Sequence, residues 1–186
     1  MIYEDMFLTL FPGFFDRPYV REIPTGEIYT ELVLRLDSCD DSTATDIPEG
    51  ITFGLYDGDI GKLCRAVEKV DPDWVKWFAE GGRIFCGFDG DDIASFCFLS
   101  EFGTVDGIRI GGPGCVGTVP EYRRRGIGSA MVRRAAPILR DDGCHISWIH
   151  YTHIPRWYMD MGYVPVVRWG KDGIVYKEIG DLGNIG

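Results

Sequence analysis

The chain has 186 residues, of which 45% are hydrophobic, 13% aromatic and 26% charged, and its net charge is −10 at pH 7. This length and composition indicate one globular domain, or one domain with an extension, and exclude a disordered or collagen-like chain. The negative charge argues against nucleic acid and anionic membranes as partners, because both are polyanions. It favours cationic small molecules or basic partners instead.

The start of the chain and its cysteines predict a cytoplasmic protein. The first residues are acidic where a secretory signal needs Lys or Arg, and no apolar run approaches the roughly 18 residues of a membrane span. The cysteines form no CxxC pair and no metal-ligand spacing with the histidines, so we expect buried free thiols and no metal site. They are Cys39, Cys64, Cys86, Cys97, Cys115 and Cys144.

The segment of residues 1–50 is expected to be an irregular extension that packs on a domain formed by residues 51–186. Aromatic residues crowd its start, which favours contact with the domain over exposure to solvent. From Thr25 onward its apolar residues recur at helical spacing, which predicts a helix there. These residues are Ile28, Leu32, Val33 and Leu36.

From residue 51 onward, strand and helix patterns follow one another. The order predicts a mixed sheet with helices on its faces, in the α/β (α+β) class. A proline inside a helix costs about 3 kcal/mol, so Pro137 predicts a kink or an early end of its helix. The expected strands are 51–56, 83–88, 93–102, 108–119, 145–151, 163–169 and 174–177, and the expected helices are 59–70, 73–78, 126–139 and 154–161.

The segment of residues 116–130 carries the clearest chemical signal. It reads as a strand, a proline, three arginines, two glycines and then a helix. The first turn of a helix presents unpaired N–H groups and a positive dipole, and glycines let an anion approach the backbone. Residues 121–140 hold six arginines and one acid, whereas residues 37–59 hold seven acids and no Lys or Arg. A basic region therefore lies on an acidic protein, as a phosphorylated ligand would require.

Other phosphate-binding motifs fit this segment less well. The GxxxxGK[ST] loop is absent, and the third small residue of the dinucleotide fingerprint is replaced by Met131. An ordinary solvent-facing arginine surface remains the better interpretation for the outer arginines.

Two segments together resemble the signatures of the GNAT (Gcn5-related) superfamily of acyl-CoA-dependent N-acetyltransferases. The run Arg123-x-x-Gly126-x-Gly128, preceded by Val-Pro-Glu-Tyr, resembles the acyl-CoA-binding signature. The run from Trp157 to Tyr163 resembles the tyrosine-containing segment that follows the fifth strand of that family. The resemblance covers about residues 51–177, and the predicted order of elements is that of the family.

The resemblance implies a role for each matching position. Backbone groups of the preceding strand would pair with the pantetheine arm, and amides of the loop and first helical turn would hold the pyrophosphate. Tyr158 would be the catalytic residue, protonating the departing thiolate. A strand amide at Val116 or a neighbour would polarise the thioester carbonyl. The implied cofactor-binding residues are Val116, Gly117, Thr118, Arg123, Arg124, Arg125, Gly126, Ile127, Gly128 and Ser129.

Some positions depart from the family pattern. Tyr151 stands where many members have an asparagine that contacts the cofactor, and the strand before the loop lacks the usual glutamate base. Glu101, His150 or a water chain remain candidates for the base. Cys115 suggests an acyl-enzyme, but its glycine and valine neighbours favour a packing role.

The sequence thus predicts direct transfer of an acyl group, expected to be acetyl, from acetyl-CoA to the amine of a small molecule or peptide. A non-catalytic acyl-CoA-binding regulatory or interaction module is the alternative. Residues 1–50 would cover the acceptor site, lie on the sheet or contribute to a homodimer, and these alternatives stay open.

Overall fold

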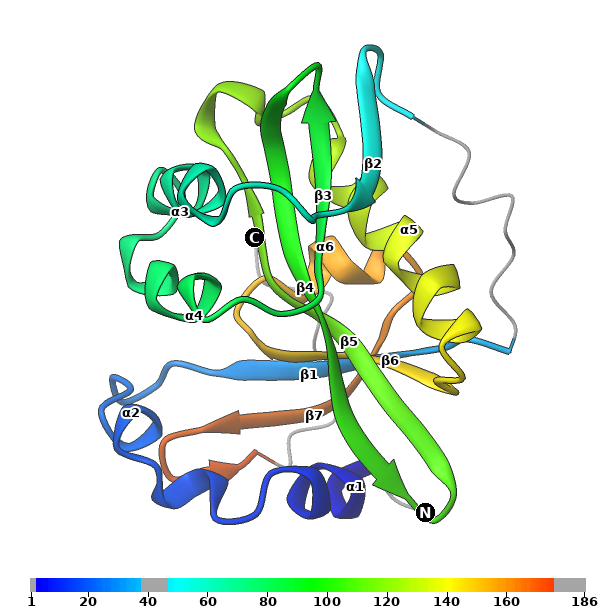
Figure 1. Cartoon of the computed structure of the whole chain (residues 1–186). Coiled ribbons are helices and arrows are strands. Elements are labelled where there is room, and N and C mark those ends of the chain that lie inside the picture. The colour runs from blue at the N-terminus through cyan, green and yellow to red at the C-terminus, as the bar shows by residue number, and fades with distance from the viewer. Residues whose placement is uncertain (1–2, 38–46, 176–186) are drawn as a thin grey trace.

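A computed structural model describes residues 3–37 and 47–175, which form a mixed sheet with helices on both faces (Figure 1). This confirms the predicted fold class. The strands are β1 (Tyr29–Arg35), β2 (Ile51–Leu55), β3 (Ile84–Asp89), β4 (Asp92–Val105), β5 (Ile108–Thr118), β6 (Ile146–Thr152), β7 (Val164–Gly170) and β8 (Gly173–Ile174). The α-helices are α1 (Tyr3–Leu10), α2 (Pro18–Arg21), α3 (Ile60–Glu68), α4 (Val75–Ala79), α5 (Ile127–Asp141) and α6 (Pro155–Met159). Short 3-10 helices are η1 (Phe14–Asp16), η3 (Pro72–Trp74) and η4 (Pro120–Tyr122).

The strands of the described residues lie in the order β2-β3-β4-β5-β6-β1-β7-β8. Neighbouring strands are antiparallel except β5 and β6, which are parallel. A parallel pair needs a crossover between its strands, and α5 supplies it. The end of β5 therefore leads directly into the turn before α5.

Successive side chains of β4 point to opposite faces of the sheet, so their contacts show which helices cover each face. On β4, Phe96 packs with residues of α3 and α4, whereas Cys97 packs with residues of α5. Phe102 lies an even number of residues from Phe96 and contacts the cluster of α1 and η1, so these N-terminal helices share the face of α3 and α4. The opposite face is covered by α5 and α6.

The segment expected to be a helix from Thr25 is instead the strand β1, and the helix prediction is wrong. β1 is hydrogen-bonded to β6 on one side and to β7 on the other, so this part of the N-terminal segment lies inside the sheet. Its apolar residues face both ways: Val33 packs against the N-terminal helices and Leu32 against α6. A strand buried on both faces has apolar residues without strict alternation, which imitates helical spacing.

A fully buried carboxylate lies in the middle of β1. Glu31 is 0% exposed, and its oxygens accept hydrogen bonds from the indole N–H groups of Trp148 and Trp169, each at 2.7 Å. They also accept from the Tyr151 amide at 3.1 Å, and His150 Nδ1 lies 2.9 Å away. Four partners from β6 and β7 thus satisfy a group that would otherwise be costly to bury.

The helix α5 continues past Pro137 to Asp141, so of the two predicted outcomes, a kink or an early end, the early end is wrong. The buried residues Ala135, Ala136 and Leu139 lie on both sides of the proline and pack in the core cluster beneath the sheet. Burial of this continuous apolar face offsets the loss of one backbone hydrogen bond.

The other predicted elements of residues 51–174 are confirmed within a few residues at their ends. The predicted final strand extends to Lys177, which, like Cys39, lies outside the described residues. No helix among residues 3–37 and 47–175 combines the length and hydropathy needed to cross a membrane.

The Glu31 network leads to a stability prediction. Glu31→Gln presents an amide NH₂ to N–H donors in a buried site, so we expect the free energy of unfolding in urea to fall by about 3 kcal/mol. The control Glu22→Gln alters an exposed side chain and should change it by less than about 0.5 kcal/mol. Equal stability of the two variants would contradict the structural role assigned to Glu31.

Candidate active site

The strand β5 carries an irregularity next to its end. Phe96 pairs with Gly117 and Phe98 with Gly114, so two β5 residues, Cys115 and Val116, lie opposite a single β4 residue. Cys115 has a φ of 47°, a left-handed conformation that costs a non-glycine residue about 1 kcal/mol. This β-bulge bends the strand at the position where the sequence predicts a backbone contact to the thioester.

Beside the bulge, β5 loses its second neighbour. The pairing of β5 with β6 covers Ile110–Ile146 and Gly111–Ser147, and no later pair occurs in the described residues. At Gly112 the two backbones are still so close that an added Cβ would lie 2.0 Å from the carbonyl oxygen of Trp148. Beyond this contact, the β6-facing edge of β5 has no strand partner, which would let an extended ligand pair with it.

The turn from β5 to α5 ends at an uncapped helix N-terminus. Gly126 is the N-cap, has a φ of 75° and makes no side-chain capping bond. A Cβ at Gly126 would meet no atom within 4 Å, so the space beside this glycine is open. Among the residues that the structure describes, no side chain caps the first-turn N–H groups of α5, an arrangement suited to an anion.

The arginines before this N-terminus are partly held by the protein itself. Arg123 donates from Nε to the Thr118 carbonyl oxygen at 3.1 Å, and Arg125 donates to Asp89 at 3.4 Å and to the Glu49 carbonyl oxygen at 3.3 Å. Arg124, with a φ of 62°, turns the backbone. We call residues 123–128 the arginine–glycine loop.

The arginine–glycine loop borders a depression of about 280 Å³. Trp157 of α6 forms one of its walls, and a Cβ at Gly128 would lie 3.5 Å from that indole. The two sequence signatures, 29 or more residues apart in the chain, therefore meet at one site. The lining residues are Thr118, Tyr122, Arg123, Arg124, Gly126, Ile127, Gly128, Ser129 and Trp157.

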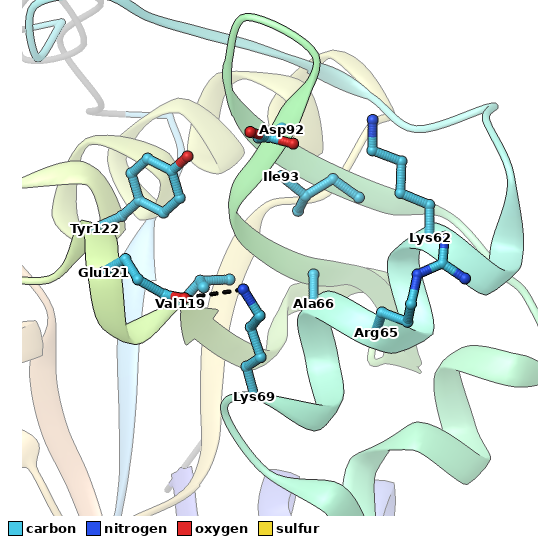
Figure 2. Close-up of a pocket in the computed structure, with 9 residues that line it drawn as sticks. All are labelled: Lys62, Arg65, Ala66, Lys69, Asp92, Ile93, Val119, Glu121 and Tyr122. Atoms are coloured by element: carbon cyan, nitrogen blue, oxygen red, sulfur yellow. Dashed lines mark hydrogen bonds and ion pairs between the residues drawn. The ribbon is translucent and has the colours of Figure 1, made fainter.

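A larger depression of about 580 Å³ lies on the α3 side of η4 and shares Tyr122 with the first (Figure 2). Two cations of α3, Lys62 and Arg65, and the C-cap residue Lys69 line it. Lys69 is paired with Glu121 at 2.9 Å, and Lys62 donates to the Asp91 carbonyl oxygen. Two criteria for a pyrophosphate site disagree here. Volume favours the larger depression, whereas the uncapped N-terminus of α5 favours the smaller one. The smaller depression is the better candidate for an anion site, because no side chain of the described residues caps the first turn of α5.

Tyr158 lies in the core between α6 and the sheet, and only 6% of it is exposed. It packs with Leu32, Ile149 and Tyr163, and Val116 of the bulge joins the same cluster. Burial, with a smaller contribution from nearby thiols, raises the pKa of Tyr158, so the phenol keeps its proton at neutral pH. The structure thus brings the predicted proton donor and the predicted carbonyl-polarising strand together.

The base candidates differ sharply in their surroundings. Glu101 is exposed and forms a bidentate ion pair with Arg109, which lowers the pKa of Glu101 and makes it a weak base. His150 is bonded to the buried Glu31. Burial raises the pKa of the Cys115 thiol to about 11, so this thiol is a poor nucleophile at neutral pH.

The predicted cofactor-binding residues converge at one end of β5 and the start of α5, and their roles stay predictions. Val116, Gly117 and Thr118 end the strand. Ile127 has a buried side chain, so only its backbone can contact a ligand. Sequence reasoning missed Glu31 altogether, and it missed the contributions of Tyr122 and Trp157 to the depression.

Comparison with known proteins gives a consistent result. Residues 80–165 match the family model of the acetyltransferase (GNAT) domain. Residues 80–165 thus form a domain of the GNAT type, in agreement with the resemblance of the two sequence segments. No curated protein sequence matches it.

Several solved structures share the GNAT fold with this chain. A GCN5-related glucosamine N-acetyltransferase region of a fungal multi-domain GH3 β-N-acetylglucosaminidase has a TM-score of 0.70 at 21% identity, over 80% of this chain and 21% of that one. A GCN5-related N-acetyltransferase from Sphaerobacter thermophilus has a TM-score of 0.61 at 20% identity, over 77% and 50%. A GCN5-related N-acetyltransferase from Kribbella flavida has a TM-score of 0.56 at 18% identity, and the match covers 87% of this chain and 65% of that one. The match thus spans about a fifth of the length of the first of these chains and half of the length of the second.

The arginine–glycine loop can be tested with a pair of variants at Gly126. Asp and Asn both tolerate the left-handed conformation of Gly126, but only Asp adds a negative charge. In calorimetric titrations with CoA, we expect Gly126→Asp to weaken binding about 100-fold through repulsion of the pyrophosphate, and Gly126→Asn to weaken it less than about tenfold. Equal losses in both variants would show that the loop does not hold a phosphate.

Proposed function

We propose that this protein transfers an acetyl group from acetyl-CoA to the amine of a small molecule or peptide, in the cytoplasm and without an acyl-enzyme. The observation that carries the proposal is the uncapped N-terminus of α5 at the end of β5, beside the point where β5–β6 pairing stops. The match of residues 80–165 to the GNAT domain, which supports acyl transfer from acyl-CoA in general, agrees with it.

The residues of the site fit an acyl-CoA ligand. The arginine–glycine loop and the first turn of α5 would hold the pyrophosphate, and the free edge of β5 would pair with the amide groups of the pantetheine arm. A backbone N–H at the bulge would polarise the carbonyl group. Tyr158, whose phenol is protonated at neutral pH, would donate its proton to the departing sulfur.

A non-catalytic acyl-CoA-binding module remains the second candidate function. The absence of a carboxylate on β5 between Gly114 and Thr118, together with the ion pair that occupies Glu101, favours it. A protein that binds CoA yet releases no free thiol with any amine would support this alternative.

The decisive experiment is a thiol-release screen with acetyl-CoA and a panel of amino acids, aminoglycosides, polyamines and peptides. Calorimetry with acetyl-CoA accompanies it as a measure of binding. Binding with release of thiol in the presence of an amine supports the proposal. Absence of binding at millimolar acetyl-CoA would refute it.

The role of Tyr158 can be tested with a neighbouring tyrosine as control. Tyr158→Phe should lower kcat about 100-fold while affinity for acetyl-CoA changes little, because only proton donation is lost. Tyr163→Phe removes a hydroxyl from the same cluster, where it bonds to Ser147, and should leave kcat nearly unchanged. Similar kcat values in both variants would remove the general-acid role.

The absence of an acyl-enzyme predicts the behaviour of a thiol variant. Cys115→Ala should keep most of the turnover and retain kinetics in which both substrates bind before release of CoA, because the high pKa of this thiol makes it a poor nucleophile. Loss of turnover together with trapping of an acetylated Cys115 in the wild type would contradict direct transfer.

A further inference from the structure

We propose that His150 is the general base of this site and that Glu31 is its positioning residue, an inference that rests on the proposed function. The base would take one proton from the ammonium group of the acceptor. The carboxylate–imidazole pair, and not either residue alone, carries the assignment.

The hydrogen bond to Glu31 determines which ring nitrogen is available. The fully buried Glu31 lies 2.9 Å from His150 Nδ1, and an ionised carboxylate only accepts hydrogen bonds. Nδ1 therefore carries the proton, and in the neutral ring the lone pair is on Nε2. The other partners of Glu31 are the N–H groups of Trp148, Trp169 and Tyr151, so His150 is its only titratable partner among the described residues.

The ring of His150 is also held in place by aromatic packing. Phe11 stacks on it with centroids 4.1 Å apart and an interplanar angle of 9°, and Phe14 contacts its edge at 5.3 Å. The His150 side chain keeps 20% of its exposure, and no hydrogen bond to Nε2 occurs within residues 3–37 and 47–175. A ring held in place, partly exposed and with Nε2 not bonded to the described residues has the properties that a base requires.

The position of His150 along β6 places it at the level of Tyr158. Ile149 packs against Tyr158 on the α6 face, and His150, the next residue, faces the N-terminal helices on the opposite face. Continuing the parallel register from Gly111–Ser147 brings His150 level with Gly114, adjacent to the bulge. The proton donor and the proposed base thus flank the β5–β6 divergence from the two faces of the sheet.

The protons of the proposed acetyl transfer balance. His150 Nε2 takes one proton from the acceptor ammonium and passes it to solvent. The neutral nitrogen then forms a bond to the carbonyl carbon while the carbon–sulfur bond breaks, and Tyr158 gives its proton to the sulfur. The second proton released by the nitrogen restores the Tyr158 phenol, so one proton leaves per turnover.

The kinetic test compares two small acceptors of different basicity. At neutral pH methylamine is almost wholly protonated and needs a base, whereas hydroxylamine is largely neutral and does not. His150→Asn keeps an N–H group near Glu31 and removes Nε2, so we expect transfer to methylamine to fall about 100-fold, with little change for hydroxylamine. The control His153→Asn alters an exposed histidine nearby and should leave both rates unchanged.

A second measurement needs no turnover. In ¹⁵N NMR spectra of the unliganded chain, the ring of His150, assigned by its loss in His150→Asn, should show protonated Nδ1 and unprotonated Nε2 in its neutral form. Glu31→Gln should shift it towards a mixture of tautomers. A neutral ring protonated at Nε2 in the wild type would overturn the proposal.

The outcomes separate this inference from the proposed function. Failure to bind acetyl-CoA refutes the proposed function. Turnover in which His150→Asn changes both acceptors equally, or neither, refutes the base and leaves the acetyltransferase intact. Binding of acetyl-CoA without transfer to any acceptor refutes both the enzymatic function and the base.

Discussion

The site depends on one interruption in the sheet. β5 remains paired with β4 to its end, but its pairing with β6 stops after two residue pairs. A β-strand whose N–H and C=O groups lack a partner must find one in water or in a ligand. The bulge at Cys115 and the close backbone contact at Gly112 fix where the interruption begins, and η4 and the arginine–glycine loop connect the end of β5 to α5. The free strand edge and the candidate anion site thus follow from the same geometry.

The distribution of charge also distinguishes the candidate anion site from the rest of the protein. The chain is strongly acidic as a whole, yet arginines and an uncapped helix N-terminus meet at one loop. Arg125 spans from that loop to Asp89 of the β3–β4 hairpin, and Lys69 connects α3 to Glu121 of η4. These exposed ion pairs contribute little to stability, but they restrict the loop before a ligand arrives.

The sequence was sufficient to predict the features that depend on neighbouring residues. Strand, glycines and helix follow one another around Gly126, so local chemistry alone indicated an anion site. The strand β1 was not predictable in this way, because its burial on both faces imitates helical spacing. Glu31 looked like a surface residue, since its partners lie 117 to 138 residues away in the chain. The bulge at Cys115 was not predictable, because the neighbouring glycines allow several backbone conformations.

The place of β1 between β6 and β7 has a consequence for how the chain reaches its fold. During synthesis, β1 leaves the ribosome long before either of its neighbours, and its apolar residues have no sheet to join until then. The centre of the sheet therefore closes last and through contacts of large sequence separation, which slow folding and expose an unpaired apolar strand to other chains. We therefore expect a chaperone to cover β1 in the nascent chain until β6 and β7 emerge from the ribosome.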